Sequence, residues 1–338
     1  MKMPRIRLLV VDDSPYMLMA LRTMVKICPE IEIVGEAVDG AQAVEMAARL
    51  SPDVITMDVN MPGMDGIEAT RRIMASHPCP IVMLSSLTEK GAATTFRALE
   101  LGAVDYLPKS SSAIDIDLAS IAEQLAAKIK FWGTHRADDA PPAATVVLPD
   151  PPVGVDMVLI VGGTGAPSLA GQLVGAVATA NLPVLIAQFM PASFTTPFVE
   201  FLSRGANRPV REGQHGTLLA PGTLTVVPSH RSCVVKRGAA DMLSVQFADR
   251  DAPACDLLES VAKTAKAPLV VLLSGEARSL DRFATAWSGR GALWVQARDT
   301  AVCIDLPSAV CASGLPLRIL EPQDLVSALR RAGSRVAA

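Results

Sequence analysis

Short apolar runs alternate with helical stretches along the first 110 residues, and this alternation constrains the fold more than any other feature of the sequence. Five such βα repeats predict a doubly wound α/β domain with a parallel sheet, whose ligands bind at the carboxyl ends of the strands. The expected strands are residues 5–11, 32–37, 54–58, 81–84 and 105–107. The expected helices are residues 15–27, 40–49, 66–76, 88–101 and 116–130.

A second α/β pattern follows a segment of different composition. Residues 131–154 contain five prolines and no sustained periodicity, which is typical of a linker. The elements expected beyond it are strands at 157–161, 184–188, 224–227, 234–236, 243–247 and 269–273, with a glycine-rich turn and a helix after the first of them. The sequence therefore predicts α/β domains at residues 1–125 and 156–338, joined by a linker at 126–155.

Composition excludes several classes of protein. Half of the residues are apolar, 19% are charged and the net charge is −3, so we expect neither a nucleic-acid partner nor insertion into a membrane. The amino terminus lacks the apolar core of a secretory signal, and no apolar run approaches the roughly 18 residues of a membrane span. The six cysteines have no metal-ligand spacing, which favours reduced thiols in a cytoplasmic protein.

Three carboxylates stand at the carboxyl ends of two predicted strands. Asp12 and Asp13 follow the first strand, and Asp58 ends the third. Parallel strands bring these ends together, so the three anions would repel one another unless a cation lies between them, and such oxygen ligands suit Mg²⁺. A metal there also offsets the charge of an incoming phosphoryl group. We therefore expect Asp58 to accept a phosphoryl group as a carboxylate nucleophile.

Two further polar residues end the fourth and fifth predicted strands. Ser85, in IVMLSS, would bring a hydroxyl to a phosphoryl oxygen. Lys109, in YLPK, would bring an ammonium charge, which is a common role of lysine at phosphate. A single polar residue at a strand end is commonly only a cap or part of a turn. Because these residues and the carboxylates stand at the ends of one predicted sheet, they indicate a single site.

The motifs LLVVDDSPYM, VITMDVNMPGMDGIEATRRI and SSLTEKGAATTFRALELGAVDYLPK resemble the receiver domain of two-component response regulators over residues 5–125. The resemblance implies a flavodoxin-like fold that holds Mg²⁺ directly through Asp13, Asp58 and the backbone carbonyl of Asn60, with Asp12 in support. A histidine kinase of the chemotaxis type is then the expected phosphoryl donor.

The same resemblance concerns two more positions. Tyr106 is expected to be the aromatic residue that reorients when the domain is phosphorylated. Ser110 stands where most receivers have a proline after the lysine. This departure affects the geometry expected for the loop that follows Lys109, while the acceptor chemistry does not depend on it.

The second half contains VLIVGGTGAPSLA, PVLIAQFMPASFT, LLAPGTLTVVPS, APACDLLESVA and VVLLSGEARSLDRF. With SSLTEKG and RALELGAVDYLPK in the first half, these motifs resemble the chemotaxis receptor methylesterases, from about residue 156 to 335. The resemblance implies a doubly wound α/β methylesterase-like domain. Members of the family hydrolyse glutamyl methyl esters and deamidate glutamines of chemoreceptors with a serine, a histidine and an aspartate. The resemblance also implies that chemoreceptors, or another signalling protein, are the partners of this chain.

The positions of that catalytic triad can be compared one by one. The family pattern G-A-S-T-G-G-P aligns with VGGTGAP, which puts Gly163 at the nucleophile, and Q-H-M aligns with QFM, which puts Phe189 at the general base. T-G-M-G-x-D-G aligns with SGEARSL, which puts Ser279 at the orienting carboxylate and Glu276 and Ala277 at Met-Gly. Glycine has no nucleophilic atom, phenylalanine cannot accept a proton and serine carries no charge. We therefore expect a pseudo-enzyme.

Other interpretations of the second half remain open. A shifted triad could use Thr164, His230 and Asp281, because Asp281 lies two residues past the missing aspartate. The GGTGAPS turn could also hold a phosphate or a dinucleotide at a helix N-terminus. It is not a G-x-G-x-x-G sequence, however, and no acidic residue ends the following strand. A tight strand-to-helix turn that came with the fold explains the glycines equally well.

The leading hypothesis is a response regulator of a chemotaxis-type two-component pathway. Phosphorylation of Asp58 would change how the inactive esterase-like domain binds a partner. One alternative is an active protein-glutamate methylesterase and protein-glutamine amidase with a rebuilt site. Another alternative is a phosphate sink that competes for the kinase and has no output of its own.

Overall fold

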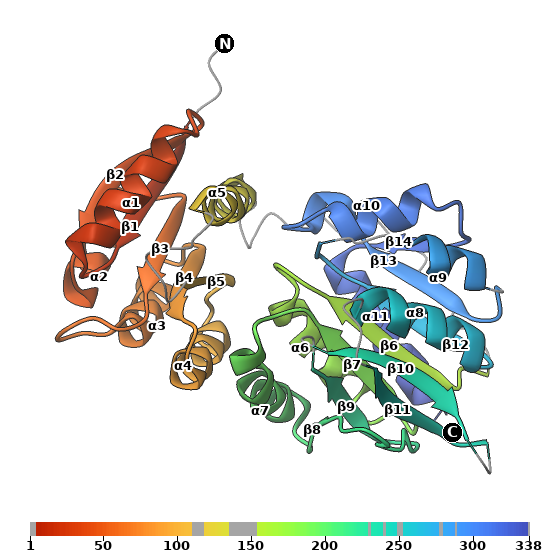
Figure 1. Cartoon of the computed structure of the whole chain (residues 1–338). Coiled ribbons are helices and arrows are strands. Elements are labelled where there is room, and N and C mark those ends of the chain that lie inside the picture. Colours follow the sequence, from red (N-terminus) through yellow and green to blue (C-terminus); the bar gives the residue numbers. More distant parts are fainter. Residues whose placement is uncertain are drawn as a thin grey trace. The chain divides into compact units, whose positions relative to one another are not determined.

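The computed structural model describes residues 5–109, 118–134, 154–228, 231–238, 241–248, 253–276, 280–287 and 289–336. Contacts divide the chain into two compact units, Met1–Thr145 and Val146–Ala338. Figure 1 labels the helices and strands of both units. Each unit has its own parallel sheet and its own apolar core.

The first unit is built on a parallel sheet with the strand order β2-β1-β3-β4-β5 (Figure 1). Its strands are β1 (Ile6–Val11), β2 (Ile31–Ala37), β3 (Val54–Asp58), β4 (Ile81–Ser86) and β5 (Asp105–Lys109). In register, Val11 of β1 lies beside Met57 of β3, and Ser85 of β4 lies beside Pro108 of β5. This register brings the polar residues of the strand ends to one edge of the sheet.

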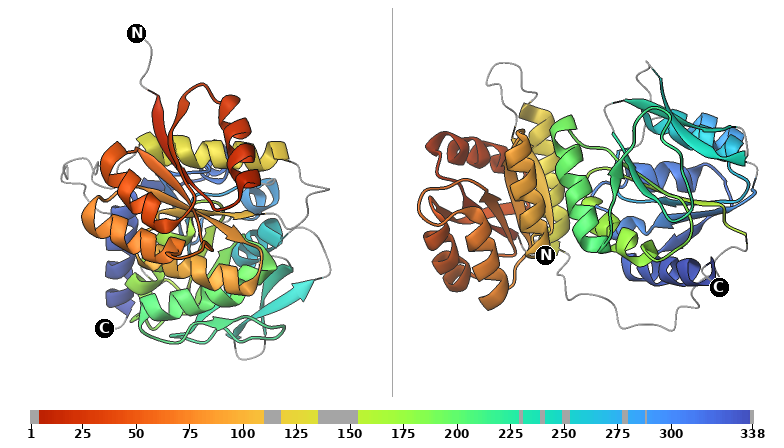
Figure 2. Two further views of the ribbon diagram at one scale, coloured as in Figure 1. Left: turned by 90° about the vertical axis from the view of Figure 1, so that its left-hand side faces the viewer. Right: turned by 90° about the horizontal axis from the view of Figure 1, so that it is seen from below.

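Helices cover this sheet, as Figure 2 shows. They are α1 (Pro15–Lys26), α2 (Gly40–Leu50), α3 (Gly66–Ser76), α4 (Glu89–Glu100) and α5 (Leu118–Thr134). Helix α1 packs against α5, while α3 packs against both α2 and α4. The side chains of Ser14, Asp39, Asp65 and Thr88 cap the first four helices, since each accepts a hydrogen bond from a backbone N–H of the first turn.

The elements of the first unit begin and end within two residues of the predicted positions, except at the carboxyl end. There α5 continues to Thr134, so residues 126–134 of the predicted linker are helical. Packing explains the difference. Ile129 is buried in the core, and the ammonium group of Lys128 pairs with the buried carboxylate of Asp105 at 2.6 Å. The local composition does not reveal these contacts.

The second unit is built on a larger parallel sheet with the order β14-β13-β12-β6-β7-β9-β8. Its strands are β6 (Met157–Gly162), β7 (Val184–Gln188), β8 (Arg211–Glu212), β9 (Leu224–Val227), β12 (Pro268–Leu272), β13 (Ala292–Gln296) and β14 (Arg318–Leu320). Strand β6 lies between β12 and β7. The loops that follow these three strands therefore meet at one edge of the sheet, where doubly wound folds bind their ligands.

The helices of the second unit complete the predicted doubly wound pattern. They are α6 (Pro167–Val177), α7 (Thr195–Ala206), α8 (Pro253–Thr264), α9 (Asp281–Ala286), α10 (Asp305–Ala312) and α11 (Pro322–Val336). Helix α6 packs against α7 and α11, and α8 packs against α9. Strands β8, β13 and β14 were not among the expected elements. The edge strands β8 and β14 have two and three residues, which is too short for a periodic signal.

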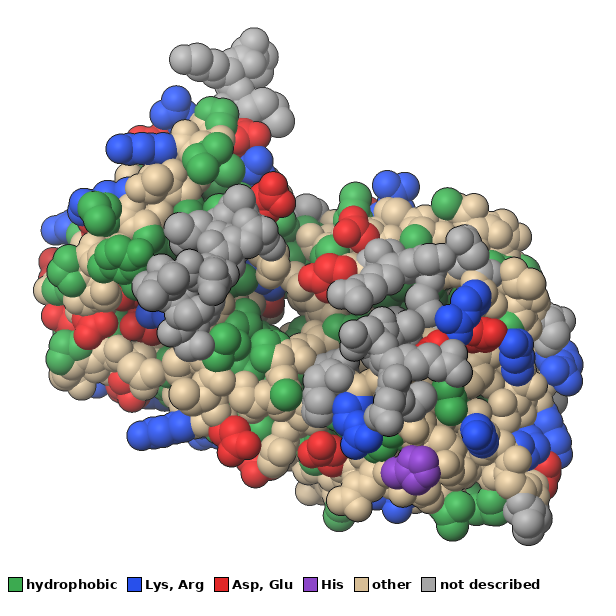
Figure 3. All heavy atoms as spheres, viewed as in Figure 1, with side chains coloured by type: hydrophobic (Ala, Val, Ile, Leu, Met, Phe, Trp, Pro, Cys, Tyr) green, Lys and Arg blue, Asp and Glu red, His purple; other side chains and the backbone are tan. Residues whose placement is uncertain are grey.

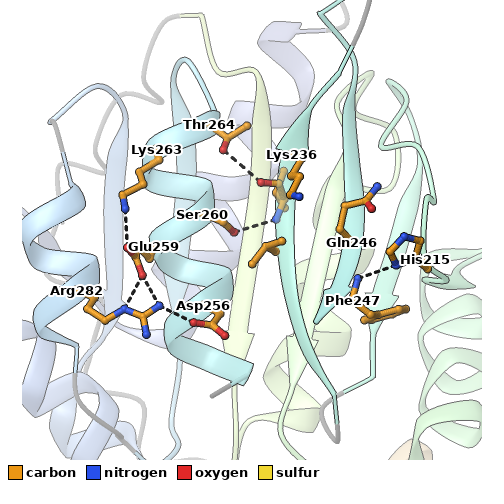
Figure 4. Close-up of a pocket in the computed structure, with 12 residues that line it drawn as sticks. His215, Lys236, Gln246, Phe247, Asp256, Glu259, Ser260, Lys263, Thr264 and Arg282 are labelled. Carbon is orange, nitrogen blue, oxygen red and sulfur yellow. Dashed lines mark hydrogen bonds and ion pairs between the residues drawn. The ribbon is translucent and has the colours of Figure 1, made fainter. Parts of the chain in front are cut away.

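An antiparallel hairpin, β10 (Ser232–Arg237) and β11 (Leu243–Ala248), packs against α8. Side chains of α8 satisfy the free edge of β10, as Figure 4 shows. Ser260 Oγ accepts from the N–H of Val235 at 2.9 Å, and Thr264 Oγ1 donates to the carbonyl of Val235 at 3.2 Å. These hydrogen bonds take the place of a third strand and so protect the edge.

A pocket of about 450 Å³ opens beside this hairpin and α8. On one side of it, Arg282 pairs with Asp256 and Glu259, so these charges offset one another (Figure 4). Its described lining residues do not belong to the loops after β6, β7 and β12. On the face drawn in Figure 3, acidic and basic side chains are interspersed. The described part of the chain contains no helix with the length and hydropathy that crossing a membrane requires.

Candidate functional site

The carboxylates of Asp12, Asp13 and Asp58 lie together at the carboxyl edge of the first sheet. Strands β1 and β3 are adjacent and parallel, so the residues that end and follow them are neighbours. One oxygen atom of each carboxylate lies within 4.8 Å of the others. Asp12 and Asp58 are buried, whereas Asp13 is exposed. The fold thus brings the three acidic residues of the sequence pattern together.

The ammonium group of Lys109 lies between the two buried carboxylates. Its Nζ atom is 2.8 Å from Asp12 Oδ2 and 2.9 Å from Asp58 Oδ1. Lys109 ends β5, which is separated from β3 by β4, and its long side chain spans that distance. Buried charges are costly unless they are paired. The lysine therefore offsets part of the negative charge of the acidic cluster.

Burial raises the pKa of Asp58 above its ordinary value. The ammonium charge of Lys109 opposes this rise, and the negative charge of Asp12 adds to it. The backbone N–H of Asn60 also lowers the pKa of Asp58 through a hydrogen bond to the carboxylate. A divalent cation among the three carboxylates would favour the charged form in the same way as the lysine does.

Ser85 and Tyr106 connect the strand ends to α4. The hydroxyl of Ser85 donates to the carbonyl of Gly91 at 3.0 Å, and the side chain is fully buried. The buried ring of Tyr106 packs edge-on against Phe96, with 6.0 Å between the ring centroids. The hydroxyl of Ser85 is thus engaged with α4, and its expected bond to a phosphoryl oxygen stays a prediction.

A buried ion pair elsewhere in the first unit was missed in the sequence. Lys128 on α5 and Asp105 on β5 are each 2% exposed, and Lys128 Nζ lies 2.6 Å from Asp105 Oδ2. The same carboxylate accepts from the backbone N–H of Tyr106 at 2.8 Å and from the indole N–H of Trp132 at 3.4 Å. A lysine within the apolar stretch LAAKIKFW is the signal that could have indicated a buried partner.

In the second unit, Ser274 ties together the loops that follow β6, β12 and β13. The N–H of Gly163 donates to the carbonyl of Ser274 at 2.8 Å. The hydroxyl of Ser274 donates to the carbonyl of Thr164 at 2.5 Å and accepts from the N–H of Cys303 at 2.9 Å. At the end of β13, Gln296 Oε1 accepts from the N–H of Ser274 at 2.9 Å. The loops therefore form one hydrogen-bonded platform.

Glu276 fills the space in front of Gly163. A β-carbon added at Gly163 would lie 2.8 Å from Glu276 Oε2 and 3.0 Å from the Cα of Gly275. The hydroxyl of Thr164 donates to the other carboxylate oxygen, Glu276 Oε1. The turn continues with Gly165 at a φ of 82°, which is a left-handed conformation that favours glycine. A side chain at position 163 therefore requires Glu276 to move.

The end of β7 supplies an amide and an aromatic ring to the same edge of the sheet. Gln188 Nε2 donates to the carbonyl of Gly163 at 2.7 Å. Gln188 Oε1 is buried and has no hydrogen-bond partner among the described residues. The backbone N–H of Phe189 donates to the carbonyl of Gly162 at 2.8 Å, and its half-buried side chain packs against the core. The Gln188 side chain thus stabilises the turn after β6 through its hydrogen bond to the carbonyl of Gly163.

Two family models match this chain. The model of the response regulator receiver domain matches residues 8–119, and the model of the CheB methylesterase matches residues 158–329. A protein-glutamate methylesterase/protein-glutamine glutaminase of Nocardioides sp. is 34% identical over 339 residues, which cover 94% of this chain and 93% of the relative. The chain belongs to the CheB methylesterase family.

Further similar proteins span both halves or one half of this CheB-family chain. A protein-glutamate methylesterase/protein-glutamine glutaminase of Alkalilimnicola ehrlichii is 34% identical and covers 95% of this chain and 98% of its own length. Among solved structures, the response regulator domain of Thermotoga maritima CheB is 45% identical. That structure covers 39% of this chain and 98% of its own length, with a TM-score of 0.36.

Two of the three triad positions aligned with the CheB family lie at neighbouring strand ends. Gly163 follows β6 and Phe189 follows β7, and these strands pair with Gly162 beside Gln188. The third position, Ser279, lies outside the described residues.

Several other predicted features also fall outside the described part of the chain. They are His230, Ser110, the side chain of Asp281 and residues 135–153 of the predicted linker. Of the shifted triad, the described part contains only Thr164, whose hydroxyl is bonded to Glu276.

Proposed function

We propose that this CheB-family protein is a phosphorylation-controlled regulator whose second unit binds its partner without hydrolysing it. The phosphoryl donor is a histidine kinase of the chemotaxis type, and the partner is a chemoreceptor or another signalling protein. The relatives are named protein-glutamate methylesterase/protein-glutamine glutaminase, which supports glutamate and glutamine side chains of a protein as the groups recognised.

Asp58 is the acceptor in this proposal. Its carboxylate attacks the phosphorus of the kinase phosphohistidine, so that an O–P bond forms while the P–N bond breaks and the imidazole leaves. Lys109 Nζ, 2.9 Å from Asp58 Oδ1, offsets the charge of the phosphoryl group. The carboxylate oxygens of Asp12, Asp13 and Asp58 lie within 4.8 Å of one another and are hard ligands that fit Mg²⁺. By the resemblance to receiver domains, the backbone carbonyl of Asn60 would be a further ligand. A bound ion neutralises negative charge on the transferred group.

The response to phosphorylation begins at α4. A phosphoryl group on Asp58 offers a new acceptor to the hydroxyl of Ser85, which would then leave the carbonyl of Gly91. Tyr106 packs against Phe96 of the same helix and is the second side chain that responds. An added charge of about −1.5 to −2, as on a phosphorylated hydroxyl, is sufficient to reorganise neighbouring loops.

One observation carries the proposal that the second unit does not hydrolyse. At the end of β6, where the family pattern has its nucleophile, Gly163 has no side chain and the carboxylate of Glu276 occupies the adjacent space. In a worked protease case the loss of the nucleophile or of the base costs about 10⁶ in kcat. Phe189, at the aligned base position, cannot accept a proton.

The direct test measures methanol release from methylated receptor and ammonia release from the glutamine form. The protein is assayed with and without a small-molecule phosphodonor. We expect neither product above background in either state. Product formation that requires the intact protein would contradict the proposal, and its loss in Thr164→Val would then identify the alternative site.

A second candidate function, an active esterase or amidase with a rebuilt site, is favoured by one contact. The hydroxyl of Thr164 donates to Glu276 Oε1, so a hydroxyl and a carboxylate acceptor stand together at the strand ends. A hydroxyl nucleophile needs such a base to remove its proton. The earlier shifted triad of Thr164, His230 and Asp281 is the other form of this candidate. Thr164→Val abolishes turnover in both forms, whereas Glu276→Gln abolishes it only in the first.

A further inference from the structure

The pocket of about 450 Å³ between the β10–β11 hairpin and α8, called here the hairpin pocket, has the size of a small-molecule site. Such sites commonly have volumes of about 300–1,000 Å³ and combine apolar walls with a few polar groups. The half-buried side chains of Val234 and Phe247 line the hairpin pocket. Polar side chains of the hairpin and of α8 line the rest of it, as Figure 4 shows.

Hydrogen bonds fix the walls of the hairpin pocket on both edges of the hairpin. Side chains of α8 bond to the free edge of β10. On the other edge, the carbonyl of Val245 in β11 accepts from the N–H of Gly216 at 2.8 Å. The N–H of Phe247 donates to His215 Nδ1 at 3.2 Å. The hairpin pocket is therefore formed before any ligand arrives.

The two carboxylates on the α8 side of the hairpin pocket are fully engaged. Asp256 accepts from Arg282 at Oδ1 and from the hydroxyl of Ser232 at Oδ2. Glu259 accepts from Lys263 at Oε1 and from Arg282 at Oε2, each at 2.6 Å. Every carboxylate oxygen of this side thus has a donor, and the two acidic residues are balanced by two basic ones.

The hairpin side, in contrast, contains a cation and a donor that no described residue engages. The exposed ammonium group of Lys236 has neither a hydrogen bond nor an ion pair with a described residue. Because His215 Nδ1 accepts a hydrogen bond, the hydrogen of the neutral ring is on Nε2, where no described residue accepts it. The guanidinium carbon of Arg231 lies 4.6 Å from the ring centroid of Phe247 and adds a second positive charge.

The register of the hairpin places its polar side chains on one face. Val234 pairs with Gln246 across the two strands, and Lys236 follows Val234 by two residues. Residues two apart on a strand point to the same side, so Lys236 and Gln246 flank Val234 there. His215 lies beside β11 on the same side of the pocket (Figure 4). An unpaired ammonium group attracts anions and repels cations.

We infer that the hairpin pocket binds a small organic anion. Its carboxylate or phosphate group pairs with Lys236 and accepts from His215 Nε2, and its apolar part lies against Val234 and Phe247. The hairpin pocket shares no lining residue with the loops after β6, β7 and β12, so this binding is independent of the proposed function. A bound anion contacts both the hairpin and α8 and thereby stabilises their packing.

The test measures the binding of phenyl phosphate and of benzoate to the full-length protein by calorimetry, in buffer without Mg²⁺. Benzyl alcohol and benzylamine, which are neutral and cationic, are the control probes. We expect at least one anion to bind saturably, and both control probes to bind at least about tenfold more weakly, because only an anion forms a charge-assisted pair with Lys236. The anion that binds more tightly identifies the preferred head group.

Three variants test the role of the lysine. Lys236→Gln should weaken the binding of the anion about tenfold, because a hydrogen bond to a charged group is lost. Lys236→Arg keeps the charge and should keep most of the affinity. Lys266→Gln is the matched control, since it removes the same charge from an exposed lysine that pairs with Asp241 and does not line the hairpin pocket. It should bind the anion like the unaltered protein.

Amide NMR signals of the full-length protein locate the bound anion. The signals of β10 and β11 should move with the same saturation curve as the heat of binding. Three results would overturn the inference: no saturable binding of either anion, binding of benzylamine as tight as that of the anions, or an equal loss in Lys266→Gln and Lys236→Gln. Signals that move only at the strand ends of the first unit would overturn it as well.

Discussion

The strand-end sites of the two units differ in what they present on similar parallel sheets. In the first unit, Lys109 already joins the carboxylates of Asp12 and Asp58, so the charged groups for phosphoryl chemistry stand together. In the second unit, the loops are bonded through Ser274, yet Gly163 stands where a nucleophile is expected. The comparison teaches that hydrogen bonds between the loops can hold a site in shape whichever reactive side chains it presents.

The largest expected effect is the loss of phosphorylation at the site of the first unit. Asp58→Asn should abolish labelling by the kinase or a small phosphodonor, because an amide is not a nucleophile toward phosphorus. Removal of Mg²⁺ by a chelator should do the same in the unaltered protein. Phosphate incorporation measured on gels checks both results. Asp305→Asn, at an exposed position of α10, is the control that should label normally, and label retained in Asp58→Asn would contradict the assignment.

The second prediction concerns the effect of introducing the three triad residues of the family into the second unit. Gly163→Ser, Phe189→His and Ser279→Asp together should stay inactive, since Glu276 Oε2 lies 2.8 Å from the new β-carbon. Adding Glu276→Met, the residue of the family pattern, should restore measurable esterase activity. Methanol release from methylated receptor checks this.

The four changes must act as a unit, because single triad residues contribute little alone. The Cα of Gly275, 3.0 Å from the same β-carbon, also requires a small movement of the loop. If the triple variant were as active as the quadruple one, Glu276 would not be what blocks the site.

A third prediction concerns the buried pair of Lys128 and Asp105 in the first unit. Lys128→Met should lower the free energy of unfolding of that unit by about 3–5 kcal/mol, because the charge of Asp105 stays buried without its partner. Hydrogen exchange of β5 and α5 measures the loss. Combining it with Asp105→Leu should recover part of it. An exposed control, Lys90→Met, should change little, and an equal loss there would contradict the explanation.

The fourth prediction asks whether the two regions are independent. Residues 1–134 and 154–338 should each unfold cooperatively when expressed alone, because each unit has its own sheet and core. Circular dichroism during denaturation checks this. A fragment of residues 1–117 lacks α5 and therefore exposes the apolar residues that Ile129 of this helix covers. We expect this fragment to be unstable. If 1–134 behaved no better than 1–117, the boundary would be misplaced.

The smallest effect concerns the surface of α3. Arg71 and then Arg72 lower the pKa of Glu68 to about 2 through hydrogen bonds. A carboxyl whose pKa is lower in the folded state stabilises the fold above its unfolded pKa, near 4.5, and this contribution is lost as the pH falls through about 2. The contribution is small because the group is exposed.

An NMR titration of the Glu68 carboxyl measures this shift directly. In Arg71→Gln with Arg72→Gln, the midpoint should move upward toward 4.5. An unchanged midpoint in that variant would show that the two arginines are not the cause of the low pKa.

The first site could be assembled from the sequence because its residues stand at the carboxyl ends of strands in one parallel sheet. Asp12 and Asp58 stand at the ends of the adjacent parallel strands β1 and β3, which must bring them together, and Lys109 stands at the same edge of the sheet, where its long side chain reaches them across β4. The contact of Glu276 with Gly163 could not be foreseen in this way. It depends on the path of two loops and on one side-chain rotamer, which periodicity does not describe.

The sequence by itself determined the parallel sheet of the first unit, the central strands of the second and the polar residues that stand at the ends of these strands, because strands and turns leave a local pattern of apolar and polar residues. The tertiary structure alone decided that α5 runs to Thr134, that Lys128 pairs with Asp105, and that Glu276 occupies the space before Gly163. These features arise from contacts between residues distant in the chain, whose geometry depends on packing and loop path rather than on local preference.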